Sequence, residues 1–148
     1  MNDAEYNRLK EELDGLVDLW KERLKLAYWR ISCCYYRSPS AFEAGAPPDV
    51  GQAASACCDA KWQYFDACLH FNVERIFAAN DSHEDREEIV VHELCHCVLD
   101  ELYKSAASAD GNTAFEKAEW SAHNERVTSH MTHVILSAYR PHTVEGEY

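Results

Sequence analysis

The apolar positions of the chain follow a helical repeat in three segments, and two shorter segments have the character of strands. Hydrophobic residues recur three and four positions apart over residues 3–26, 82–104 and 113–139, which predicts three long amphipathic helices. Residues 28–37 are rich in aromatic and β-prone side chains, which predicts a strand. Residues 65–76 alternate apolar with polar side chains, and the polar face of this second strand indicates an edge strand that borders a cleft.

Turn-forming and capping residues mark the ends of these elements. Glycine and proline are concentrated over residues 38–60, which are predicted as a loop with a short helical or extended piece near its end. Ser82 is a suitable N-cap for the second long helix, and Thr113 with Glu116 forms a capping-box pattern before the third. We expect residues 140–148 to form a loose tail.

Length and composition favour a single globular domain over residues 1–148. The chain has 47% hydrophobic and 27% charged residues, which suits one core and excludes a disordered chain. The formal net charge is -12 and no basic run is present, so nucleic acid is not an expected partner. The N-terminus lacks a basic start followed by an apolar stretch, and no run of about 18 apolar residues occurs. We therefore expect a cytoplasmic monomer without membrane association.

The cysteines match no common metal or disulfide framework. There are seven of them, with adjacent pairs at Cys33-Cys34 and Cys57-Cys58 and no C-x-x-C pattern. We therefore expect most of them to be small buried side chains of a protein that resides in a reducing compartment.

The helix predicted at residues 82–104 carries an H-E-x-x-H motif, with His92, Glu93 and His96 at its chemical positions. Residues four apart differ by about 40° around a helix, so the two imidazoles project from one face and can share a metal ion. Glu93 lies about 100° from His92, beside the metal, where it can accept a proton from bound water. The motif therefore predicts a catalytic zinc ion.

The remaining side chains of this helix agree with such a site. Its apolar residues form one arc, with the two histidines at the edge between core and surface. The arc consists of Val91, Leu94, Cys95, Val98, Leu99 and Leu102. Asp100 follows His96 by four residues, and it is either a hydrogen-bond partner of an imidazole or an exposed carboxylate.

A catalytic zinc ion usually has three protein ligands and one open position, so a third ligand is needed. The candidates on the last helix are Glu116, Glu119, His123, Glu125, His130 and His133. Glu116 already has a role in the capping box. The choice among the others depends on which face of the helix each one occupies.

The last helix has an apolar stripe and a face of small residues. The apolar stripe contains Trp120, Val127, Met131, Val134 and Ala138. The small face contains Ala118, Ser121, Ala122, Ser129 and Thr132, and Glu125 is the ionisable side chain at its centre. Small side chains let another helix approach closely, and His123 lies about 200° from Glu125. Glu125 is therefore predicted as the third ligand, and the alternative is a surface or salt-bridged glutamate.

These features resemble the gluzincins, and more narrowly the small single-domain minigluzincins and phage-type H-E-x-x-H proteins. The resemblance rests on the order of elements, the motif at residues 92–96 and the Asn124-Glu125 pair, and it covers most of the chain. Thermolysin-like gluzincins have an aspartate where this chain has Ser129, so Ser129 and Asp100 are the residues expected to support the ligand histidines. The resemblance implies a zincin-like α+β fold, in which a sheet of about three strands packs on the N-terminal helix, the motif helix and the glutamate helix.

The motif and the resemblance together predict a zinc metalloendopeptidase with one Zn²⁺ ion. Glu93 is expected to activate the metal-bound water for attack on a peptide bond. The resemblance implies that the peptide binds in extended form along residues 69–76 by strand addition. His70 and Asn72 on the polar face of that strand are the expected substrate contacts.

Two other interpretations stay open at this point. The chain can be a zinc-binding regulatory or interaction protein with a zincin-like fold and little or no turnover. It can also be a metal-free helical interaction domain with a chance motif. The donor that would stabilise an oxyanion is open as well, between Tyr103, Tyr139 and a histidine of the last helix.

Overall fold

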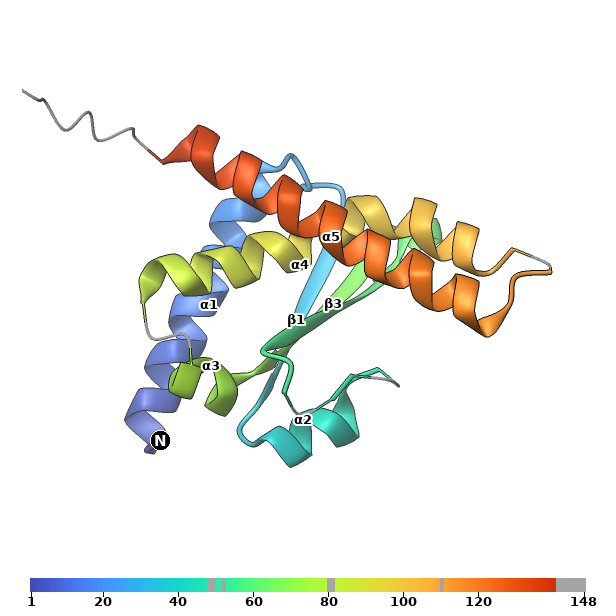
Figure 1. Cartoon of the computed structure of the whole chain (residues 1–148). Helices are drawn as coiled ribbons and strands as arrows, with labels where there is room; N and C mark the ends of the chain where they lie inside the picture. Colours follow the sequence, from blue (N-terminus) through green and yellow to red (C-terminus); the bar gives the residue numbers. More distant parts are fainter. Residues whose placement is uncertain (48–49, 52, 80–81, 110, 141–148) are drawn as a thin grey trace, which may run out of the picture.

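The computed structural model shows a small α+β fold, with helices arranged around one sheet (Figure 1). The described residues are 1–47, 50–51, 53–79, 82–109 and 111–140. The elements in chain order are α1 (Asp3–Arg23), β1 (Arg30–Tyr36), α2 (Pro39–Gly45), β2 (Ala56–Lys61), a 3-10 turn (Trp62–Tyr64), β3 (Asp66–Asn72), α3 (Val73–Ala79), α4 (His83–Ala107) and α5 (Ala114–Tyr139). No helix within these ranges combines the length and the apolarity needed to cross a membrane.

The three strands form one mixed sheet in the order β1-β3-β2. β3 is parallel to β1 and antiparallel to β2, so it is the central strand. Two neighbouring rows across the sheet are Cys33–Leu69–Cys58 and Cys34–His70–Cys57. Successive residues of a strand point to opposite faces, so the first row faces one side of the sheet and the second row faces the other.

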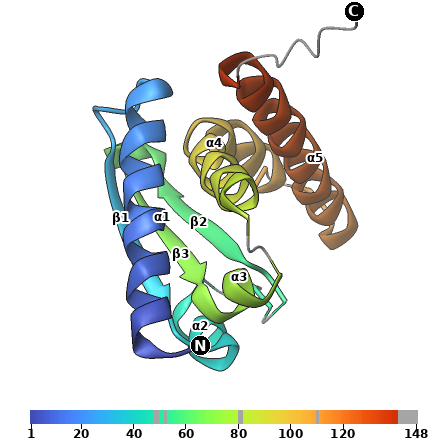
Figure 2. The ribbon, with the colours of Figure 1, turned by 90° about the vertical axis from the view of Figure 1, so that its left-hand side faces the viewer.

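Helices cover the two faces unequally. Two side chains on the Leu69 face contact helices. The sulfur atom of Cys58 lies 3.9 Å from that of Cys97 on α4, and the Tyr35 hydroxyl donates a hydrogen bond to Asp14 of α1. α1 and α4 therefore pack on the face that carries Leu69, and α5 packs on α4 (Figure 2). The core between these layers contains Leu13, Trp20, Leu26, Leu69, Phe71, Ile76, Val90, Val91 and Leu94. The opposite face is covered in part by α2, whose Phe42 ring meets the ring of Tyr36.

The stability of this core can be measured on α1. Leu13 is fully buried, whereas Leu19 on the same helix is 39% exposed. Leu13→Ala should lower the free energy of unfolding by about 2–5 kcal/mol, because it removes apolar contacts and leaves a cavity. Leu19→Ala is the matched control and should change it by less than about 1 kcal/mol. Urea unfolding measures both values, and equal losses would contradict the packing of α1 described above.

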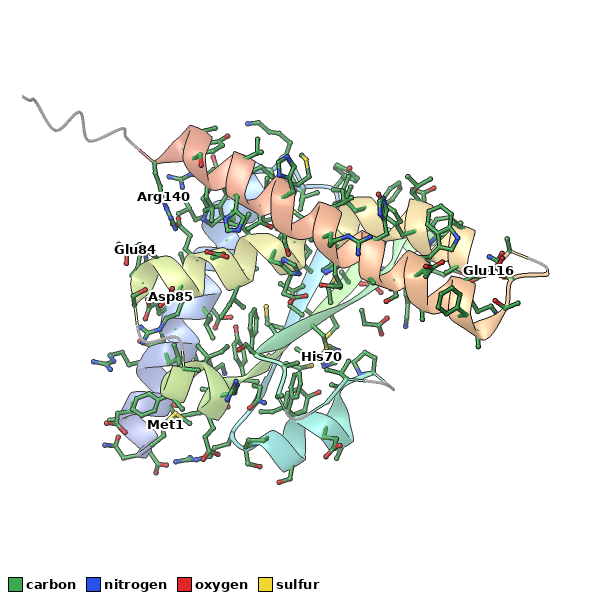
Figure 3. The ribbon with its side chains drawn as sticks, in the orientation of Figure 1. Met1, His70, Glu84, Asp85, Glu116 and Arg140 are labelled. Carbon is green, nitrogen blue, oxygen red and sulfur yellow. The ribbon has the colours of Figure 1, made fainter. Side chains whose placement is uncertain are left out.

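The helix starts follow the capping residues that the sequence predicts. The Ser82 hydroxyl accepts a hydrogen bond from the backbone N–H of Asp85 at the start of α4. Thr113 and Glu116 form a complete capping box at the start of α5. These two short-range patterns therefore give the correct starts of both long helices, at the ends where Figure 3 labels Asp85 and Glu116.

The expected loose tail needs a correction at its first residue. Arg140 donates to the backbone carbonyl of Glu84 and to the Glu87 carboxylate, so the end of α5 is joined to the start of α4 (Figure 3). The two helices therefore run antiparallel. Residues 141–148, the rest of the predicted tail, lie outside the described residues.

The predicted edge strand is wrong in two respects. β3 ends at Asn72 and residues 73–76 are already helical. β3 is also paired along both edges, so the strand with an open edge next to α4 is β2. β2 begins at Ala56, near the end of the segment 38–60, where a short helical or extended piece was predicted, and it ends at Lys61. The earlier part of that segment contains α2, where only loop was predicted. Alternation of side chains shows that the two faces of a strand differ, but it does not show how many neighbouring strands pair with it.

The buried faces of α4 and α5 also differ from the prediction. Val98 and Leu102, two members of the predicted apolar arc, are 58% and 68% exposed. Trp120, Met131 and Val134 of the predicted apolar stripe are exposed too. The residues that α5 buries are Asn124, Thr128, Thr132 and Leu136. α5 thus turns a largely polar face toward α4, and Asn124 on that face joins a hydrogen-bond network described below.

Candidate metal centre

Two neighbouring turns of α4 and one turn of α5 bring the predicted ligands together. His92 Nε2 and His96 Nε2 each lie 3.3 Å from an oxygen of the Glu125 carboxylate. The two Nε2 atoms lie 3.2 Å apart. All three sequence-predicted ligands, His92, His96 and Glu125, therefore direct a ligand atom to one point between the two helices.

A buried polar network contacts the ring nitrogen of His96 that faces away from Glu125. The Asp100 carboxylate lies 2.7 Å from His96 Nδ1 and is only 3% exposed. It also accepts hydrogen bonds from the Asn124 side chain at 3.0 Å and from Lys104 at 2.9 Å. Asp100 is therefore a partner of an imidazole, and the alternative of an exposed carboxylate is wrong.

Asn124 belongs to this buried network, although the sequence pattern predicted no role for it. It precedes Glu125, so about 100° of helical rotation separates the two side chains. Glu125 points at the histidines while Asn124 is buried against Asp100. By contrast, the predicted supporting residue Ser129 makes no contact with His92, His96 or Glu125 among the contacts of the described residues. The adjacent Asn-Glu pair was the signal from which Asn124 could have been found.

The charges around the imidazoles favour a cation. Burial lowers the pKa of His96, but hydrogen bonds to Asp100 and Glu125 outweigh burial and raise that pKa to about 10. Hydrogen bonds from His92 and His96 hold the pKa of Glu125 far below its ordinary value. Because carboxylates on two sides of His96 stabilise a positive charge there, the same arrangement suits a metal cation.

Glu93 lies beside the converging ligands in a different environment. Its side chain is 7% exposed. Burial raises its pKa to about 7, and the neighbouring His96 and His92 oppose this rise. A carboxylate whose pKa lies near neutrality can both accept and return a proton, which is the property expected of a general base.

An open cleft gives access to these side chains. A cavity of about 520 Å³ and another of about 350 Å³ share Ala56, His92, Glu93 and Glu125 among their lining residues. The strand β2 contributes to both cavities, so the open edge of the sheet runs along the cleft. Tyr103 lines the larger cavity.

The other predicted contacts lie outside this cleft. The Tyr139 hydroxyl is directed to the backbone of Arg23, and its ring packs on Trp20, so Tyr103 is the one of the two tyrosines that reaches the site. His70 and Asn72 are 7% and 0% exposed in the central strand. They lie on the face of the sheet away from α4, so the prediction that they contact a substrate in this cleft is wrong.

The donor set fits a zinc ion. Two imidazole nitrogens and a carboxylate oxygen lie within 4.8 Å of one another. Two histidines and one glutamate, with a fourth position open to a cleft, are typical ligands of catalytic zinc. Histidines that bind metal usually have the other ring nitrogen fixed by a hydrogen bond, as Asp100 does for His96.

Comparison with known proteins adds no relative to this picture. No protein-family model, curated protein or solved structure matches the chain. The function therefore has to be inferred from the chemistry of the site itself, which is a histidine-glutamate donor set with a buried carboxylate beside it in an open cleft.

Proposed function

We propose that the chain is a zinc metalloendopeptidase with a zincin-like fold, and that His92, His96 and Glu125 hold one Zn²⁺ ion. The observation that supports this most strongly is the convergence of these three ligand atoms at the floor of a cleft, with Glu93 next to them. A structural zinc ion would not need a buried carboxylate beside it or an open approach. The combination favours hydrolysis over a purely structural role.

Each side chain has a distinct part in the proposed reaction. A zinc ion bound there lowers the pKa of water and polarises a carbonyl oxygen. Glu93 accepts the proton of the attacking water and delivers it to the leaving amine. Tyr103 lines the cleft, and we propose it as the hydrogen-bond donor to the developing oxyanion. Asp100 fixes the orientation of His96 and does not itself contact the substrate.

The substrate is proposed to add as a strand to β2 rather than along residues 69–76. Ser55 accepts a hydrogen bond from the backbone N–H of Asn72, and the antiparallel register continues from this pair. Backbone groups of an antiparallel strand point alternately toward and away from its partner. Ala56 and Cys58 therefore direct their backbone N–H and C=O groups away from β3, toward the cleft that both residues line.

The proposal is tested by incubating the zinc-loaded protein with a broad peptide library and identifying products by mass spectrometry. We expect cleavage that stops when a chelator removes the zinc and resumes when zinc is returned. A protein that binds zinc at His92 and His96 and cleaves no peptide would instead be the zinc-binding regulatory or interaction protein. That result would overturn the peptidase proposal.

Strand addition to β2 has its own signature in a cleaved peptide. A backbone N-methyl group removes one donor, so it should lower cleavage only at positions whose N–H faces β2. A series of singly N-methylated versions of one substrate should therefore lose cleavage at alternate positions. Losses without a period of two would contradict strand addition while leaving the metal site untouched.

Asp100→Asn tests whether the carboxylate of Asp100 supports the proposed metal ligand His96. Asparagine keeps the size of the side chain but loses the charge beside His96, so zinc affinity should fall by about 10- to 100-fold. The exposed Glu101→Gln on the same helix removes one negative charge without touching the network, and it should leave the affinity unchanged. Competition with a chromogenic chelator measures both, and equal affinities for the two variants would exclude a role for Asp100.

A further inference from the structure

A second group of metal-binding side chains lies on the opposite face of the sheet. The Cys34 and Cys68 sulfur atoms are 3.2 Å apart, and a ring nitrogen of His70 lies within 4.8 Å of both. Cys68 and His70 are two apart on β3, so they share a face, and Cys34 is the direct neighbour of His70 on β1. Figure 3 shows His70 below the sheet on the side of α2, away from α4 and α5.

The third strand adds another thiol to this face. Cys57 on β2 is the direct neighbour of His70 on its other side. Opposite residues on paired strands have Cβ atoms about 4.5–5.5 Å apart, which is within reach of a shared ion. The three strands therefore place three thiols and one imidazole on one face of the sheet, where the ligand atoms of Cys34, Cys68 and His70 converge and Cys57 is the next thiol along the row. The spacing of cysteines along the chain does not indicate this arrangement.

We propose that Cys34, Cys57, Cys68 and His70 form a second metal site that binds a thiophilic divalent cation, with zinc the first choice. Three cysteines and one histidine are a common tetrahedral set for structural zinc. Sulfur ligands of such an ion lie about 3.8 Å apart, since each Zn–S bond is about 2.3 Å. The observed sulfur separation of 3.2 Å is too long for a disulfide bond, and it reaches the tetrahedral value by a small side-chain rotation.

The surroundings of the cluster agree with this assignment. The Tyr36 hydroxyl lies 2.9 Å from His70 Nδ1 and the two rings stack, which fixes the orientation of the imidazole. A cavity lined by Asp59, Lys61, Asp66 and Cys68 opens next to one of the thiols. His70 is only 7% exposed, so the site is dry on one side.

The second site would stabilise the sheet rather than carry out catalysis. Its ligands join all three strands, and a metal ion there would connect β2, the strand that borders the cleft, to β1 and β3. Binding of a metal by native ligands contributes directly to the free energy of folding. The inference does not depend on the proposed peptidase activity, because no ligand is shared with His92, His96 or Glu125.

Cobalt substitution tests the proposal on the full chain. Co²⁺ bound by thiolates absorbs in the near ultraviolet through sulfur-to-metal charge transfer, whereas a site of histidine and glutamate has no thiolate and lacks this band. The reduced, metal-free protein should bind two equivalents of Co²⁺ and develop the band with one of them. A wild-type protein that binds cobalt without this band would overturn the proposal.

Substitutions of single cysteines test which residues give rise to the charge-transfer band. Cys68→Ser should abolish it and leave one equivalent bound, and Cys57→Ser should weaken the sulfur-bound equivalent by at least about tenfold. Cys33→Ala, one residue from Cys34 but on the other face, is the matched control and should keep the band. The double variant His92→Ala/His96→Ala should keep it as well, whether or not the protein retains activity. A band that survives Cys68→Ser would overturn the assignment.

Oxidation of the thiols to a disulfide is the remaining alternative to metal binding. A Cys34–Cys68 disulfide in protein purified under reducing conditions would lower the intact mass by two hydrogens and exclude the metal. Intact mass measured before and after denaturing alkylation distinguishes the two states. A disulfide that re-forms in the presence of excess zinc and reductant would overturn the proposal, and alkylation of Cys34, Cys57 and Cys68 only after zinc removal would support it.

Discussion

Glu93→Gln is expected to lower the rate of peptide cleavage by about 10²- to 10⁴-fold, the usual contribution of a positioned general base. Glutamine has nearly the same shape as glutamate but cannot accept the proton of the attacking water. Glu93 is not among the three converging ligands, so zinc content should stay the same. Cleavage of a library-derived peptide, together with zinc content, measures both effects.

The Glu93 experiment has a matched control on the same helix. Glu101 of α4 is exposed, and Glu101→Gln should leave both cleavage and zinc content unchanged. Full activity in Glu93→Gln would rule out Glu93 as the base. Loss of zinc from that variant would instead show that the residue acts on the metal site, and the loss of activity would then have a different cause.

Glu125→Ala is expected to lower zinc affinity at the histidine site by at least about 100-fold. The carboxylate supplies one of three ligand atoms, and loss of a residue that only supports a ligand already costs about 10- to 100-fold. The affinity should be measured by chelator competition in a Cys34→Ser background, so that the sulfur cluster does not contribute. Peptide cleavage should fall with zinc occupancy and recover in part at high zinc concentration.

His123→Ala is the control for Glu125, because His123 was a rival for the third ligand position. Its ring lies against Tyr103 and Trp120, and its Nδ1 is 3.3 Å from the Arg126 guanidinium. The variant should therefore keep wild-type zinc affinity. Zinc lost from His123→Ala but retained by Glu125→Ala would contradict both the helical-angle argument and the observed packing of α5.

Residues that act within one helix were predictable because a helix has a fixed geometry. His92 and His96 lie on one face of α4 because residues four apart do so in every α-helix, and their Nε2 atoms are close together in the structure. The N-caps Ser82 and Thr113 depend on neighbours only three residues away. The choice of Glu125 as the third ligand also followed from angles around one helix. The apolar stripe predicted on the same helix, however, is largely exposed.

Features that depend on pairing between distant segments were not predictable in the same way. The alternating pattern of β3 identified a strand, but its position between β1 and β2 is decided by hydrogen bonds to residues far along the chain. The cleft therefore borders β2 instead of β3. The burial of the polar residue Asn124 on α5 likewise depends on a distant segment, since its partner Asp100 lies on α4.

The sequence by itself therefore determined the long helices, their capped starts and the histidine pair of the proposed zinc site, because these depend on spacings of a few residues. Only the tertiary structure decided which strand borders the cleft, and which residues support His96. It alone brought Cys34, Cys57, Cys68 and His70 to one face of the sheet. The physical reason is that strand order and register are set by long-range hydrogen bonds and burial, which no local pattern encodes.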